Sequence, residues 1–204
     1  MKTRELRLLS GLTIEKREDG EDYMPTIRGY AAVFDTETVI GGSDWGFREK
    51  IAKGAFTEAI RTSDVRALYN HDEEYVLGRV KSGTLRLAED DRGLKVEIDP
   101  PDTQDARDLI KRMQRGDIDQ MSFAFTMEGG VQTWDETGDM PLRIIEKVGD
   151  LLDVSVVTYP AYPETEAAAR SLAACRKERQ RQNFLNAARR LERKAMQEQK
   201  FRGI

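Results

Sequence analysis

The stretch that decides the fold is Asp119-Gln120-Met121-Ser122-Phe123-Ala124-Phe125-Thr126. Its bulky residues Met121, Phe123 and Phe125 alternate with smaller or polar ones, and this period of two predicts a β-strand with one face against a core. On this pattern the hydroxyl of Ser122 lies on the opposite face, where another chain can approach it. A serine is a weak nucleophile until a base takes its proton. The interest of Ser122 therefore depends on a base nearby.

The one histidine of the chain, His71, is the natural candidate for that base. It stands at the end of a second predicted strand, residues 65–72, and residues 73–75 are predicted to form the turn that follows. Taken singly, each residue has an ordinary explanation, because strand serines are usually solvated and a lone histidine is usually a satisfied polar group. The functional hypothesis requires Ser122 and His71 to meet in space.

A Ser–His pair also needs a carboxylate that fixes the imidazole tautomer and supports the imidazolium ion. The downstream candidates are Glu146, Asp150 and Asp153. Asp153 is favoured by its strand pattern, in which Leu152, Val154 and Val156 are predicted to point inward. This alternation would put Asp153 and Ser155 on the other face of the strand.

The composition indicates a soluble protein of a reducing cytoplasm. Of the 204 residues 39% are hydrophobic and 34% are charged, and no apolar run approaches the length of a membrane span. A single cysteine, Cys175, excludes an internal disulfide framework and a Cys-rich zinc site. One histidine also supplies too few ligands for a zinc hydrolase. We therefore expect no metal, no cofactor and no membrane association.

The charge divides the chain into two parts. Residues 163–204 hold eleven Lys or Arg and five Asp or Glu, a net charge of +6, which leaves −10 for residues 1–162. The second part is rich in Ala, Arg, Glu, Gln and Leu, a composition typical of helix. We predict an acidic domain over 1–162 and a basic helical extension over 163–204.

The domain over 1–162 is predicted to be mainly β (α+β), with roughly seven to nine strands and two short helices. Residues 84–88 and 94–98 alternate with period two around a charged turn and predict a hairpin. A helix is predicted from Asp102 or Thr103 to about Arg115, and a shorter one over 54–61. The residues around Trp134 are predicted to form a loop. A closed or nearly closed barrel removes sheet edges at this number of strands.

Several blocks of the sequence, taken in order, resemble a known family. They are Gly29-Tyr30-Ala31-Ala32-Val33-Phe34, residues 47–56, Leu68-Tyr69-Asn70-His71-Asp72 with Leu77-Gly78-Arg79, Met121-Ser122-Phe123-Ala124-Phe125, and residues 152–161. Together they are similar to the tailed-phage (caudovirus) prohead maturation proteases over about residues 26–166. That family is similar to the herpesvirus assemblins, which are serine peptidases with a seven-stranded, partly closed β-barrel and surrounding helices. The resemblance implies such a barrel here. The long C-terminal helix, in one piece or two, is predicted from the composition of residues 164–201.

The resemblance also implies roles for the site residues. Ser122 matches the nucleophile and His71 the general base. The assemblins use a second histidine as the third member, and this chain has none. The phage branch places an acidic residue there, which Asp153 matches, with Glu146 as the alternative. Backbone N–H groups beside Ser122 or near residues 159–161 are both candidates for the oxyanion hole.

The implied function is that of a procapsid serine endopeptidase in the host cytoplasm, inside the assembling procapsid. Its partners would be the major capsid protein, whose scaffolding segment it removes, and further copies of itself. The basic extension would dock on capsid or scaffold helices, or be cut away. Nucleic acid is not an expected partner, because the arginines of the extension are not interleaved with stacking aromatics. The alternative is a noncatalytic capsid- or scaffold-binding module, in which Ser122 and His71 lie far apart.

Overall fold

The computed structural model describes residues 4–10, 12–15, 24–41 and 46–159, with isolated positions at 173, 177, 181 and 185. The chain divides into two units, residues 1–167 and 168–204, and the fold described below belongs to the first. Apart from the isolated positions, the predicted extension over 163–204 and its long helix fall outside the described residues. In the described part no helix is long and apolar enough to span a bilayer.

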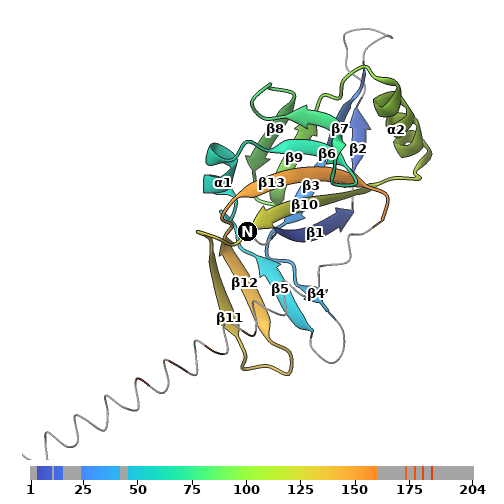
Figure 1. The fold of residues 1–204 in the computed structure, drawn as a ribbon. Helices are drawn as coiled ribbons and strands as arrows, with labels where there is room; N and C mark the ends of the chain where they lie inside the picture. Colours follow the sequence, from blue (N-terminus) through green and yellow to red (C-terminus); the bar gives the residue numbers. More distant parts are fainter. Residues whose placement is uncertain are drawn as a thin grey trace, which may run out of the picture. The chain divides into compact units, whose positions relative to one another are not determined.

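Thirteen strands and two helices make up this described part (Figure 1). The strands are β1 (Arg4–Ser10), β2 (Thr13–Glu15), β3 (Thr26–Val33), β4 (Thr38–Ile40), β5 (Phe47–Ile51), β6 (Arg66–Tyr69), β7 (Asp72–Arg79), β8 (Leu85–Glu89), β9 (Gly93–Ile98), β10 (Gln120–Thr126), β11 (Val131–Asp135), β12 (Leu142–Lys147) and β13 (Leu151–Val157). The helices are α1 (Thr57–Thr62) and α2 (Gln104–Arg115). The mainly β fold with two short helices is thus confirmed for the described residues, whereas the predicted seven to nine strands are too few.

The strands pair in three sheets. Their orders are β1-β10-β13-β6-β7, β11-β12-β5-β4 and β2-β3-β9-β8. The partly closed barrel stays a prediction, since these strands form three separate sheets. The loop predicted over residues 134–138 is confirmed for 136–138 but wrong at its start, because β11 runs to Asp135. The Trp134 indole packs edge-on against Phe47, with 4.9 Å between ring centroids.

The predicted helix over 103–115 is confirmed as α2, with both of its ends formed as the sequence indicates. The Thr103 hydroxyl accepts a hydrogen bond from the Ala106 backbone N–H at 3.4 Å, and Gly116 ends the helix in the left-handed conformation at φ 81°. One side of α2 buries Leu109 and Met113 against the core. The predicted hairpin is confirmed as β8 and β9.

The strand that carries Ser122, β10, is the second strand of the five-stranded sheet, between β1 and β13 (Figure 1). On one face Phe123 packs against Phe56 and Phe125, with ring centroids 5.4 and 5.3 Å apart. This aromatic group belongs to a core that is almost inaccessible to solvent. The nucleophile candidate is therefore held on an interior strand that packs tightly on the core.

A buried cluster of four charged side chains joins β1 to the β5–β12 part of the second sheet. Arg143 donates to Glu5 at 2.5 and 3.0 Å and to Glu49 at 2.9 Å, and Arg7 donates to both carboxylates. Arg143 is 0% exposed, and the four formal charges cancel. Burial alone would raise the pKa of Glu5, but the hydrogen bonds and charges of Arg143 and Arg7 outweigh it and hold that pKa below its ordinary value.

Replacing Arg143 by Met is expected to lower the free energy of unfolding by about 3–5 kcal/mol, because two buried carboxylates then lose their shared cation. Urea unfolding followed by circular dichroism measures this loss. The matched control is Arg86→Met, which removes an arginine that is 45% exposed and bound to Asp99. That change should cost less than about 1 kcal/mol. Equal losses in the two variants would contradict a special role for the cluster.

Candidate active site

His71 lies in a tight turn rather than at the end of a strand. β6 and β7 form a hairpin whose two-residue loop is Asn70-His71, with Tyr69 paired to Asp72. Both loop residues have left-handed backbone angles, φ 54° and 59°, as a type I′ turn requires. The turn predicted over 73–75 is wrong, because β7 begins at Asp72. A left-handed histidine is an uncommon conformation, which the surrounding contacts must hold in place.

The side chain of Asn70 supplies part of that hold. Its carbonyl oxygen accepts a hydrogen bond from the Thr158 backbone N–H at 2.8 Å, and its amide donates to the Thr158 hydroxyl at 3.2 Å. The Asn70 backbone N–H also donates to the Val156 carbonyl at 2.8 Å. Because β6 runs parallel to β13, these bonds fix the turn beside the end of β13.

Ser122 and Asp153 lie on adjacent strands of the same sheet. In the register of β10 and β13, Ser122 pairs with Ser155 and Ala124 with Asp153. Cross-strand partners share a face of a sheet, so Ser122, Asp153 and Ser155 point to one side. The prediction that Asp153 and Ser155 share a face is confirmed.

A β-bulge corrects one detail of that prediction. Ala124 pairs with Asp153 but the next residue, Phe125, pairs with Leu151, so Leu152 is the extra residue of β13. Leu152 is accordingly 37% exposed, although the alternation predicts that it points inward, whereas Val154 and Val156 are buried as predicted.

The structure brings Ser122, His71 and Asp153 into one hydrogen-bonded chain. His71 Nε2 lies 2.7 Å from Ser122 Oγ, and His71 Nδ1 lies 2.6 Å from Asp153 Oδ1. A carboxylate can only accept hydrogen bonds, so Nδ1 carries the ring proton and donates a hydrogen bond to Asp153. Nε2 then has its lone pair free to accept the Ser122 hydroxyl. This is the tautomer that general-base activation of a serine requires.

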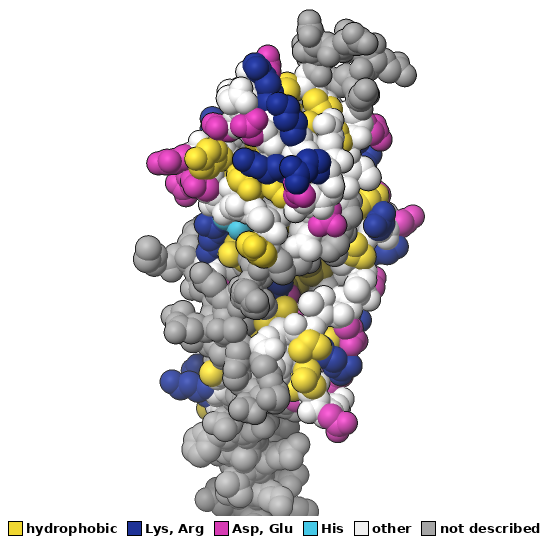
Figure 2. Space-filling model, turned by 90° about the vertical axis from the view of Figure 1, so that its right-hand side faces the viewer, with side chains coloured by type: hydrophobic (Ala, Val, Ile, Leu, Met, Phe, Trp, Pro, Cys, Tyr) yellow, Lys and Arg dark blue, Asp and Glu magenta, His cyan; other side chains and the backbone are white. Residues whose placement is uncertain are grey.

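The surroundings of Ser122 differ from the prediction. Ser122 and Ala124 are 0% exposed, so the face expected to be open is covered as completely as the aromatic face. On this face the His71 imidazole lies against the Ser122 hydroxyl, and Arg4 of β1 bonds to Asp153 of β13 across β10. The imidazole of His71 is 11% exposed. In Figure 2 histidine colour appears at one point on the surface, beside apolar side chains.

The model of the caudovirus prohead serine protease family matches residues 11–178 of the chain. The chain belongs to this family. It is therefore a serine peptidase, and membership implies a capsid maturation protease that acts on procapsid proteins. The resemblance that the sequence blocks carry is thus confirmed.

A search of solved structures found the capsid assembly protease gp21 of bacteriophage T4. The two chains are 14% identical, with a TM-score of 0.44, over 75% of this chain and 98% of that one. No curated protein sequence matches the chain.

The other two candidate carboxylates of the protease stand elsewhere. Glu146 is exposed on β12, in a different sheet, and its carboxylate accepts a hydrogen bond from the Thr133 hydroxyl at 3.0 Å. Asp150 precedes β13, and its backbone carbonyl accepts from Thr126 N–H at 2.9 Å. Of the three, Asp153 is the one bonded to His71.

Two contacts of Asp153 were not predicted from the sequence. The Ser155 hydroxyl donates to Oδ1 at 2.7 Å, and the Arg4 guanidinium donates to Oδ2 at 2.7 Å. Ser155 could have been found from its i, i+2 spacing on the same strand face. Arg4 could not, since 149 residues separate it from Asp153.

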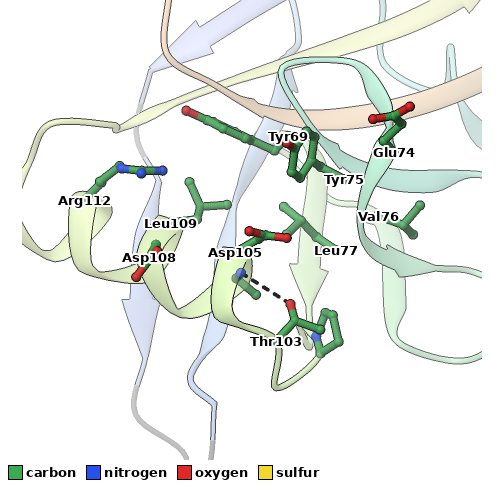
Figure 3. A pocket seen from close by; sticks show the side chains of 12 residues that line it. Tyr69, Glu74, Tyr75, Val76, Leu77, Thr103, Asp105, Asp108, Leu109 and Arg112 are labelled. Atoms are coloured by element: carbon green, nitrogen blue, oxygen red, sulfur yellow. Dashed lines mark hydrogen bonds between the residues drawn. The ribbon is translucent and has the colours of Figure 1, made fainter.

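Two cavities open beside the five-stranded sheet, and the first of them reaches Asp153. One, of about 640 Å³, is lined by Arg4, Leu68 and Asp153, and on its rim Arg79 lowers the pKa of Asp64 to about 2 through a hydrogen bond. The other, of about 340 Å³, lies between β7 and α2, where Figure 3 shows Tyr69 and Tyr75. Among the described residues, no group of three or more His, Cys, Asp or Glu is arranged to hold a metal ion.

Proposed function

We propose that Ser122, His71 and Asp153 are the catalytic triad of a procapsid endopeptidase. The observation that carries this proposal is the pair of short contacts, 2.7 and 2.6 Å, through which one imidazole joins the serine to the carboxylate. The alternative, a noncatalytic capsid- or scaffold-binding module, requires Ser122 and His71 to lie far apart. The contact between them counts against it.

In the proposed mechanism His71 Nε2 takes the proton of Ser122 as Oγ attacks the carbonyl carbon of the scissile bond. Asp153 holds the Nδ1–H and supports the imidazolium that forms. The imidazolium then gives its Nε2 proton to the leaving amine, and an acyl-enzyme remains on Ser122. Water, activated by the same imidazole, attacks the ester and frees the serine.

The oxyanion of the tetrahedral intermediate needs backbone or side-chain donors, each worth on the order of a hundredfold in rate or more. β10 is paired on both sides over residues 120–125, so the N–H groups beside Ser122 are engaged in ladder hydrogen bonds. This argues against donors beside Ser122. It favours the other candidate, residues 159–161, of which the structure describes Tyr159.

For the biological substrate we propose the scaffolding segment of the major capsid protein, and then the protease itself. Family membership supports procapsid proteins as substrates. In this proposal the enzyme works inside the assembling procapsid in the host cytoplasm and associates with its own copies. The basic extension over 163–204, following a catalytic domain over 1–162, is a docking segment or a segment removed by self-cleavage.

Digestion of the cognate capsid precursor tests this proposal. The purified full chain is expected to release the scaffolding segment and to shorten itself, with the cut sites given by mass spectrometry of the products. A His71→Gln variant should leave both proteins intact, because the glutamine amide is too weak a base to take the Ser122 proton. A wild-type chain that binds the precursor without cutting it would instead support the binding-module alternative.

A further inference from the structure

Among the residues that the structure describes, Arg4 is the one partner of the Asp153 carboxylate that belongs neither to β10 or β13 nor to the turn that carries His71. Its guanidinium donates to Asp153 Oδ2 at 2.7 Å, while the imidazole and Ser155 both bond to Oδ1. Asp153 is 4% exposed, and a buried carboxylate is costly unless its oxygens are bonded and its charge is compensated. Arg4 supplies the cation.

The register of the sheet explains how Arg4 reaches Asp153 across an intervening strand. On β10, Ala124 pairs with Leu6 of β1 on one side and with Asp153 of β13 on the other. Arg4 pairs with Thr126, two residues further along the same face. The small side chain of Ala124 leaves room over β10 for the arginine to cross to Asp153.

The alternate residues of β1 hold the strand in that register. Glu5 and Arg7 point to the opposite face, where they join Glu49 and Arg143 in the buried cluster. Arg7 also lies over the Phe125 ring, 5.4 Å from its centroid. A slip of one residue would turn both charged side chains away from the cluster and Arg4 away from Asp153. The cluster therefore sets which face of β1 meets the triad.

We propose that Arg4 is a positioning residue of this protease, which acts through Asp153 and is aligned by the Glu5–Arg7–Glu49–Arg143 cluster. This inference rests on the proposed triad. It comes from the structure rather than from the family match, because that match begins at residue 11. The role requires a cation that fixes Oδ2 so that Oδ1 stays aimed at His71 Nδ1, and it requires no contact with substrate.

The test compares Arg4→Met, Arg4→Lys and Arg28→Met in the full chain. Arg28 is the matched control, because its side chain is 38% exposed against 37% for Arg4 and it pairs with Glu15 and Glu97 on another sheet. The probe is a fluorophosphonate, which reacts with an activated serine and needs no peptide substrate. The rate of serine modification is measured at increasing concentrations of the probe. The data give the limiting rate constant at saturation and the probe concentration at which half of that rate is reached.

Arg4→Met is expected to lower the limiting rate constant about tenfold to a hundredfold, the range for losing one hydrogen bond to a charged group, with the half-maximal concentration unchanged. Arg4→Lys should recover most of the rate, because an ammonium can also donate to the single oxygen that Arg4 contacts. Arg28→Met should react like the wild type. A loss confined to the half-maximal concentration would place Arg4 in reagent binding and overturn the proposal.

A proton NMR spectrum of the chain with nitrogen-15-labelled histidine gives a second readout, which reports on the hydrogen bond of His71 Nδ1 itself. The chain has one imidazole, so a single Nδ1–H proton bonded to a carboxylate is expected far downfield. It should shift or broaden in Arg4→Met, return in Arg4→Lys and stay in place in Arg28→Met. A slow Arg4→Met with an unchanged imidazole spectrum would overturn the proposal. A wild type without adduct on Ser122 would contradict the proposed triad itself, and the role of Arg4 would fall with it.

Discussion

Replacing Ser122 by Ala is expected to lower the rate of proteolysis on the order of a millionfold, the loss seen when a triad nucleophile is removed. Without the hydroxyl no acyl-enzyme forms, and His71 Nε2 has no proton to accept. The fold should remain, because the substitution removes one oxygen from a packed strand and costs about 1 kcal/mol. Mass spectrometry of self-shortening over time measures the rate, and circular dichroism checks the fold.

Ser82→Ala serves as the matched control for this change. Ser82 is exposed in the turn before β8, where its hydroxyl donates to the Arg79 carbonyl at 3.0 Å and lies within hydrogen-bond distance of the Thr84 hydroxyl rather than of a triad residue. This variant should shorten itself at the wild-type rate. A folded Ser122→Ala chain that shortens as fast as the wild type would remove Ser122 from the mechanism.

Replacing Asp153 by Asn is expected to lower the turnover rate about ten-thousandfold. The amide can turn its NH₂ group toward His71 Nδ1 and donate a hydrogen bond to it. The ring proton then sits on Nε2, the atom that must accept the proton of the Ser122 hydroxyl. The change also removes the negative charge that balances Arg4 and supports the imidazolium. Turnover of the capsid precursor at saturating concentration measures the effect.

Glu146→Gln is the control that separates the two acidic candidates. Glu146 is exposed and bonded to Thr133, so its neutralisation should leave turnover unchanged. The reverse outcome, loss with Glu146→Gln and full activity with Asp153→Asn, would make Glu146 the third member of the triad.

Local patterns in the sequence were sufficient for much of the fold. Alternating residues predict the strand at 120–126 and the hairpin of β8 and β9. Thr103 indicates where α2 begins and Gly116 where it ends. These features depend on neighbours within a few residues along the chain. Short strands such as β11, whose side chains alternate between half-buried and exposed, carry a weaker signal and were missed.

The candidate site shows where such patterns reach their limit. The insertion of Leu152 as a bulge depends on which residues of β10 face β13, and strand pairing is not encoded in a single alternation. The turn at His71 lacks the glycine that usually marks a type I′ loop and is held by Asn70 and Thr158, 88 residues apart. The reach of Arg4 to Asp153 depends on the order of three strands. The bulge, the turn and the Arg4–Asp153 contact all depend on residues that are far apart in the sequence and come together only when the sheet forms.

The most direct test of the central claim is the location of the adduct after the full chain reacts with a fluorophosphonate. In the proposed triad the imidazole of His71 activates one hydroxyl, so peptide mapping should find a single adduct, on Ser122, and His71→Gln should suppress it. No adduct on the wild type, or an adduct on another serine that persists in His71→Gln, would contradict the triad.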